Sequence, residues 1–124
     1  MKQKDIVKLL RKEFGHHEVT VFTASVKNRA GILDCDVAYN GESIWVEIKI
    51  GSDSLKRMQQ QFMRRHQRRS ISLRFVEDKI ESTIYDCTGY PKFKYYEIDE
   101  YKRTFEYSLS EVVGFIIREE LDLL

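Results

Sequence analysis

Apolar and polar positions follow two different periods along this chain, and the two periods predict helices and strands. Apolar residues recur at helical spacing over residues 4–14, 54–68 and 108–121. Ser108 is followed three residues later by Glu111, which predicts a capping box at the start of the last helix. We therefore expect helices near the beginning, in the middle and at the end of the sequence.

Runs rich in β-branched and aromatic residues predict the strands. They cover residues 18–26, 33–39, 43–50, 71–76 and 83–87, with weaker candidates at 93–98 and 104–107. Asn40 and Gly41 form a strong hairpin signal, so the second and third strands should pair antiparallel. The order of elements predicts an α/β fold in which helices flank a mixed β-sheet.

The length of 124 residues indicates one domain spanning 1–124. Its composition, 42% hydrophobic and 33% charged residues, is consistent with a folded domain. No window approaches the roughly 18 uninterrupted apolar residues of a membrane span, and the first residues have no signal-peptide pattern. Cys35 and Cys87 lie in predicted strands without metal-ligand spacing, and we interpret both as reduced core residues. The chain is therefore expected to be soluble and cytoplasmic, with no membrane partner.

Positive charge is concentrated in residues 54–69, a segment without Asp or Glu, although the formal net charge of the chain is only +1. The basic residues of this segment are Lys56, Arg57, Arg64, Arg65, Arg68 and Arg69. Clustered cations of this kind contact nucleic-acid phosphates. We predict that these six residues bind DNA; the alternative is an ordinary solvated helix face.

Glu-x-Lys triplets occur three times, at residues 47–49, 77–79 and 100–102. Only the first triplet lies within an apolar strand, where burying charge costs free energy. Strand alternation places Glu47 and Lys49 on one face of that strand. Asp34 and Asp36 share a face of the preceding strand, so the hairpin can bring these carboxylates together. This pattern singles out the first triplet as candidate chemistry.

Carboxylates that converge need a counter-ion, and Mg²⁺ or Mn²⁺ prefers oxygen ligands of this kind. Asp34 and Glu47 are the predicted metal ligands, and Lys49 would orient the attacking water or stabilise developing charge. From the residues alone, Asp36 could replace Asp34 as the principal ligand. The alternative is a hydrated polar face of a two-sided sheet.

The segment around these residues resembles the PD-(D/E)xK nuclease superfamily, most closely its VRR-NUC branch. The matching positions are Gly31, Asp34, Glu47, Lys49, Leu55 and Gln59. The resemblance implies a restriction-endonuclease-like core, an added metal ligand in the Ile48 carbonyl, and a catalytic set of Asp34, Glu47, Lys49 and Gln59. The chain departs from the family pattern at Leu33, where proline is usual.

The family also places a glutamate near the start of its first helix, where this chain has no glutamate. Asp5 and Glu13 are the candidates for that fourth carboxylate, although an ordinary solvated acid is the favoured interpretation of each. The sequence leaves this position open.

The function expected from these features is a metal-dependent DNA endonuclease, structure-selective for branched or junction DNA. The family resemblance implies a homodimer, for which the final helix could supply either a dimer surface or core packing. Residues 5–11 also resemble the opening helix of archaeal Holliday junction resolvases. The alternatives are therefore such a resolvase, or a non-catalytic nucleic-acid-binding module on a nuclease fold.

Overall fold

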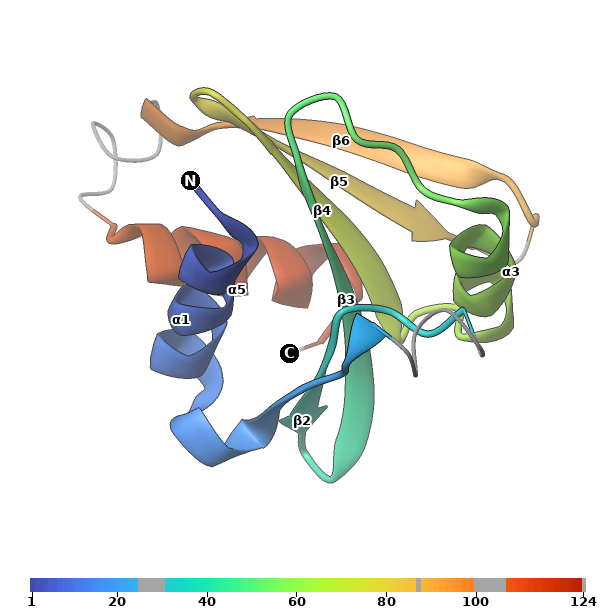
Figure 1. Ribbon diagram of the computed structural model, residues 1–124, viewed down its shortest axis with the longest axis horizontal. Coiled ribbons are helices and arrows are strands. Elements are labelled where there is room, and N and C mark those ends of the chain that lie inside the picture. Colours follow the sequence, from blue (N-terminus) through green and yellow to red (C-terminus); the bar gives the residue numbers. More distant parts are fainter. Residues whose placement is uncertain (25–30, 87, 100–106, 124) are drawn as a thin grey trace.

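A six-stranded mixed sheet forms the centre of the computed structural model, which describes residues 1–24, 31–86, 88–99 and 107–123 (Figure 1). The strands are β1 Val19–Val21, β2 Cys35–Tyr39, β3 Glu42–Ile50, β4 Ser70–Val76, β5 Lys79–Tyr85 and β6 Pro91–Glu97. Their spatial order follows the sequence. Neighbouring strands pair antiparallel except β3 and β4, which are parallel.

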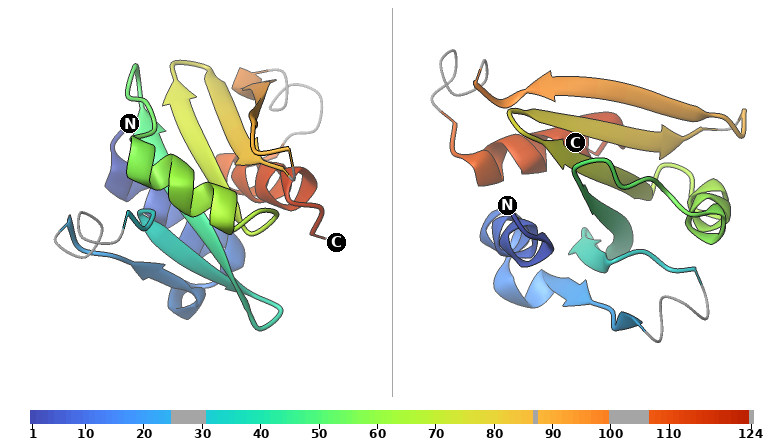
Figure 2. Two further views of the ribbon diagram at one scale, coloured as in Figure 1. Left: turned by 90° about the vertical axis from the view of Figure 1, so that its right-hand side faces the viewer. Right: turned by 45° about the horizontal axis from the view of Figure 1, so that its top comes forward.

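Helices cover both faces of this sheet (Figures 1 and 2). They are α1 Gln3–Phe14 and α5 Leu109–Glu120 on one face and α3 Arg57–Arg65 on the other, with a short 3₁₀ helix, η1 His16–Glu18, after α1. Parallel neighbours need a crossover connection, and α3 lies within the one that joins β3 to β4. The crossover therefore places α3 over the face opposite to α1 and α5.

Two clusters of apolar side chains hold these layers together. The larger cluster fills the space between α1, α5 and the sheet, and includes Ile6, Leu10, Val46, Ile48 and Ile116. The smaller cluster lies under α3 and consists of Leu33, Phe62, Met63 and Tyr85. Because only a small cluster lies under α3, much of this sheet face is left for polar side chains.

The structure confirms the predicted α/β class, the mixed sheet and the hairpin at Asn40 and Gly41, which have positive φ angles of 50° and 79°. The basic helix is shorter than predicted, because Lys56 is extended and its N–H is capped by the Gln59 side chain at 3.0 Å. The first predicted strand is also shorter, with β1 ending at Val21. Cys87 and residues 104–106 lie outside the described residues.

The final helix packs its apolar side against α1 and the sheet. Its apolar side belongs to the larger cluster, with Val112, Val113, Ile116 and Ile117 buried. Ser108 caps its first turn by accepting the Glu111 N–H at 3.4 Å. Of the two roles predicted for this helix, the structure therefore assigns its apolar side to core packing. In the described part of the chain, no helix has the length and apolarity to cross a bilayer.

Gly31→Ala should lower the free energy of unfolding by more than Gly41→Ala. Both glycines have positive φ, which costs an alanine about 1–2 kcal/mol. A Cβ at Gly31 would also lie 2.9 Å from the Met58 Cβ and 3.0 Å from its carbonyl oxygen, whereas a Cβ at Gly41 meets nothing within 4 Å. Denaturant titration of the two variants measures the difference. Equal losses would contradict the close approach of this loop to α3.

Candidate active site

Strand β3 presents charged side chains to the α3 face of the sheet. Val46 and Ile48 belong to the larger apolar cluster, and Glu47 and Lys49, which alternate with them along the strand, point to the opposite face. Both charged residues are buried, with relative exposures of 2% for Glu47 and 8% for Lys49. The predicted alternation is therefore confirmed, and it places two opposite charges in a region where water has little access.

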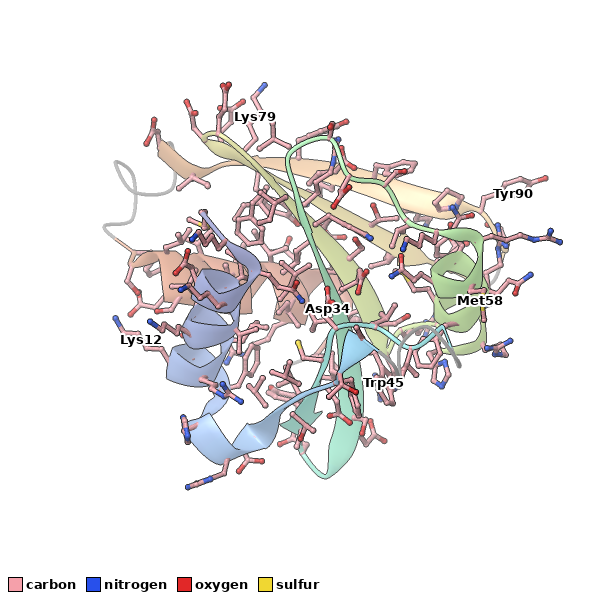
Figure 3. All side chains as sticks on the ribbon, viewed as in Figure 1. Lys12, Asp34, Trp45, Met58, Lys79 and Tyr90 are labelled. Carbon is pink, nitrogen blue, oxygen red and sulfur yellow. The ribbon has the colours of Figure 1, made fainter. Side chains whose placement is uncertain are left out.

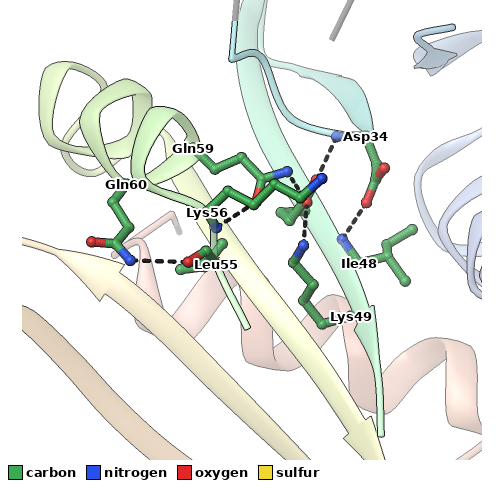
Figure 4. A network of polar contacts seen from close by, with 8 residues as sticks. Asp34, Ile48, Lys49, Leu55, Lys56, Gln59 and Gln60 are labelled. Carbon is green, nitrogen blue, oxygen red and sulfur yellow. Dashed lines mark hydrogen bonds and ion pairs between the residues drawn. The ribbon is translucent and has the colours of Figure 1, made fainter. Parts of the chain in front are cut away.

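Asp34 reaches this pair from the segment that leads into β2. Its backbone N–H donates to Glu47 Oε1 at 2.9 Å, and its own Oδ2 accepts the Ile48 N–H at 2.7 Å (Figure 4). The two carboxylates therefore lie on the same side of the sheet. Asp36 lies farther along β2, where its Oδ2 accepts a hydrogen bond from Ser43 at 2.7 Å. The structure thus brings Asp34, rather than Asp36, to Glu47.

Helix α3 completes the network from above the sheet. Gln59 Nε2 donates to Glu47 Oε2 at 2.6 Å, and Lys49 Nζ lies 3.1 Å from the same oxygen. The other amide atom of Gln59, Oε1, accepts the N–H of Lys56. Gln59 is thus oriented at both ends of its amide, and the glutamine singled out by the family resemblance reaches the carboxylate of the Glu-x-Lys triplet (Figure 4).

The surroundings of Glu47 favour its protonated form. Burial and, to a smaller extent, the nearby Asp34 carboxylate together raise the pKa of Glu47 to about 7, and Lys49 opposes the rise. Two carboxylates that share one buried site hold a proton more readily than either would alone. A bound cation would favour the ionised form instead. The site is therefore electrostatically suited to bind a cation.

A cavity of about 370 Å³ opens over these residues. Its lining includes Asp34, Glu47, Ile48, Lys49 and Gln59 at the base, and Gln3, Asp53, Lys56, Arg57 and Met58 around them. A second cavity of about 440 Å³ adjoins it and shares the residues Lys49 and Asp53. The candidate site is therefore open to a ligand larger than water.

Two polar residues of the cavity lining were not predicted from the sequence. Gln3 enters the cavity from the first turn of α1, and Asp53 enters it from the turn after β3. Asp53 had a signal in the sequence, since it is an acid six residues after Glu47. Gln3 had only a weak signal, its position near the start of the first helix, because nothing local to it shows that the helix begins beside β3.

Neither acid predicted on the first helix reaches the cavity. The Asp5 carboxylate turns back onto its own helix and accepts the Lys2 N–H at 2.8 Å. Glu13 lies at the other end of α1, where its Oε1 accepts a hydrogen bond from Arg118 of α5 at 2.8 Å. The structure therefore brings neither of the two candidates, Asp5 and Glu13, to the cavity. The residue of α1 at that place is Gln3.

The six predicted DNA-binding residues divide into different surroundings. Lys56 and Arg57 line the cavity over Glu47, and Arg64 lines the adjoining one. Arg64 also stacks over the Tyr85 ring at 4.9 Å. Arg65 and Arg68 are exposed, whereas Arg69 forms an ion pair of 2.6 Å with Glu42 of the β2–β3 hairpin. Three of the six residues therefore line the two cavities, and Arg69 is engaged by an acid of the protein itself.

The donor set suits a hard divalent cation. Asp34 and Glu47 offer carboxylate oxygens, and the Ile48 carbonyl points to the same edge of β3 as the Ile48 N–H, which faces Asp34. Among the described residues, no group of three or more His, Cys, Asp or Glu is arranged to hold a metal ion. A metal here would therefore rest on two carboxylates, a backbone carbonyl and water.

Comparisons of the chain with protein-family models, with curated proteins and with solved structures find no significant match. The geometry and chemistry of the site itself are therefore the basis for inferring its function.

The stability of the metal-free protein should fall as pH rises from about 4.5 to about 7. The Glu47 pKa is about 7 in the folded state against an ordinary value of 4.5, so the folded state binds more protons over this interval. The pKa shift corresponds to a change of roughly 3 kcal/mol in the free energy of unfolding. Urea unfolding in EDTA across this pH range should show the fall in the wild type. Glu47→Gln should have a shallower pH dependence, and equal slopes would contradict the assignment.

Proposed function

We propose that this protein is a metal-dependent DNA endonuclease that hydrolyses phosphodiester bonds with Mg²⁺ or Mn²⁺. One observation carries the proposal: Asp34, Glu47 and Lys49 meet at the buried base of a cavity whose rim holds Lys56 and Arg57. Buried acids next to a lysine suit metal-assisted hydrolysis, and cations at the rim suit a phosphate-bearing substrate. The restriction-endonuclease-like core belongs to the same proposal.

Each residue of the site has a separate part in the proposed chemistry. Asp34, Glu47 and the Ile48 carbonyl would hold the cation, which when bound polarises the scissile phosphate and makes bound water more acidic. Lys49 would hold the attacking water in line and then stabilise the charge that develops on the phosphate oxygens. Its Nζ already lies 3.1 Å from Glu47, so the ammonium is fixed before a substrate arrives.

Gln59 acts as a positioning residue in this scheme. Its amide donates to Glu47 Oε2, so it fixes the orientation of a proposed metal ligand while remaining neutral itself. Lys56 and Arg57 follow one another directly at the start of α3 and line the same cavity. They would contact the phosphates on either side of the cleaved bond. Contacts of this kind position a nucleic acid without reading its sequence.

Branched or junction DNA is the proposed substrate class. The cavity is lined by groups that suit phosphates and a cation, and contacts with phosphates carry no sequence information. A homodimer acting in the cytoplasm is part of the proposal. Its contact surface would differ from the apolar side of α5, because that side is buried within the monomer.

Asp34→Ala, Glu47→Ala and Lys49→Ala should each reduce cleavage by at least about 100-fold, because each removes a proposed ligand or charge-stabilising group. The assay incubates protein with plasmid, linear duplex and four-way junction DNA in Mg²⁺, Mn²⁺ or EDTA. Glu77→Ala and Lys79→Ala are matched controls, since they alter a second Glu-x-Lys triplet whose side chains are exposed. Circular dichroism establishes that every variant is folded.

The products distinguish the alternatives. Symmetric paired nicks confined to four-way junctions would identify a Holliday junction resolvase, and cleavage of other branched substrates would support the broader nuclease. Binding without cleavage in every metal condition would contradict the enzyme and leave a non-catalytic binding module. Cleavage that survives both Asp34→Ala and Glu47→Ala would show that the site lies elsewhere.

Mn²⁺ should raise the melting temperature of the wild type and have little effect on Asp34→Ala and Glu47→Ala. A ligand present at a hundred times its dissociation constant stabilises the folded state by about 2.7 kcal/mol. The increase should be larger at pH 8 than at pH 6, since a proton competes with the cation at Glu47. Differential scanning fluorimetry with an EDTA reference measures the shift. Equal shifts in all three proteins would indicate binding away from the site.

A further inference from the structure

A second basic surface lies next to the candidate site, on α1 rather than on α3. A groove of about 850 Å³ runs between α1 and β1, and it shares two lining residues, Gln3 and Ala24, with the cavity over Glu47. The cationic residues of this groove are Lys2, Lys4, Lys8 and Arg11. Among the described residues, no acid lines it. The groove and the candidate site are therefore neighbouring parts of one surface.

Helical geometry places these cations in a row. Lys4, Lys8 and Arg11 are spaced by four and three residues, so they share one side of α1. The distance from the first to the last is about 10 Å at 1.5 Å per residue. About three nucleotides of one B-form strand have the same axial rise. The row is therefore long enough to lie along about three nucleotides of one strand.

These charges have no close acidic partner among the described residues. Lys2, Lys4, Lys8 and Arg11 make no ion pair there; Asp5 accepts the backbone N–H of Lys2 and interacts with Lys4 and Lys8 only at longer range. Lys4 and Lys8 are exposed. Arg11 donates to the Val19 carbonyl at 3.4 Å, and its Nε finds no hydrogen-bond partner in the described part of the chain.

We propose that this α1 groove is a track for the DNA backbone, along which one arm of the substrate leaves the candidate site. The inference rests on the proposed function and extends it by naming a second contact surface. Cations without close ion pairs, in a groove continuous with the site, are complementary to a phosphate backbone. The substrate would then run from Lys56 and Arg57 over Glu47 and along α1.

An anionic membrane fits this groove less well than a nucleic acid. Helices that bind membrane surfaces insert an apolar side into the lipid. The apolar side of α1 is formed by Ile6, Val7 and Leu10, which are buried against α5 and the sheet. The exposed side of α1 therefore offers charge rather than an apolar helix face. The groove also has apolar lining from Val7, Val21 and Phe22, but its position beside the candidate site favours the substrate itself.

Salt dependence of DNA binding tests the track. Lys4→Gln/Lys8→Gln should weaken binding of a labelled four-way junction by at least about tenfold near 0.1 M salt and reduce the slope of log K against log salt by about 2, because each lost phosphate contact removes roughly 0.9. Lys12→Gln/Lys79→Gln is the matched control, since it removes equal charge outside the groove; Lys12 points away from Asp34 (Figure 3). Fluorescence anisotropy in EDTA measures binding without cleavage.

The outcomes separate the track from the nuclease. Three results would overturn the track, even if cleavage is observed. They are a slope in Lys4→Gln/Lys8→Gln equal to that of the wild type, an equal loss of DNA affinity in the control variant, and no DNA binding by the wild type. A reduced slope in a protein that cleaves nothing would support the track and contradict the proposed enzyme. Flotation with phosphatidylserine vesicles that depends on Lys4 and Lys8, without an effect on DNA binding, would assign the groove to lipid instead.

Discussion

The buried carboxylate of Glu47 is the group that organises the polar half of this molecule. A charge at 2% exposure on a strand inside the sheet needs partners, since an unpaired buried charge is very costly. Its partners come from the segment before β2, from α3 and from its own strand: the Asp34 N–H, Gln59 and Lys49. The same contacts that compensate the charge therefore also hold the layers in register.

The position of this group follows from the topology of the sheet. β3 and β4 are parallel, so a crossover connection must pass over one face, and α3 lies in it. The opposite face is filled by α1, α5 and the larger apolar cluster. Only the α3 face can therefore combine a buried carboxylate with a cavity open to a ligand. Glu47 and Lys49 face this side because side chains alternate along β3.

Positive charge in the folded protein is distributed differently from positive charge in the sequence. The segment 54–69 is the most basic stretch of the chain, yet Arg69 pairs with Glu42 and Arg64 packs over Tyr85. The cations that line the α1 groove are interrupted in the sequence by apolar residues and by Asp5. Helical periodicity and the packing of α1 against α5 bring them to one side, next to the candidate site.

The sequence by itself determined the local features: the hairpin at Asn40, the alternation that separates Glu47 from Ile48, and the class of fold. It also favoured Asp34 over Asp36. These follow from backbone periodicity and turn chemistry, which act over a few residues. Only the tertiary structure decided which distant groups meet, because that depends on how helices pack on the sheet. It placed Gln3 at the site, paired Glu13 with Arg118, and buried Leu33 under α3.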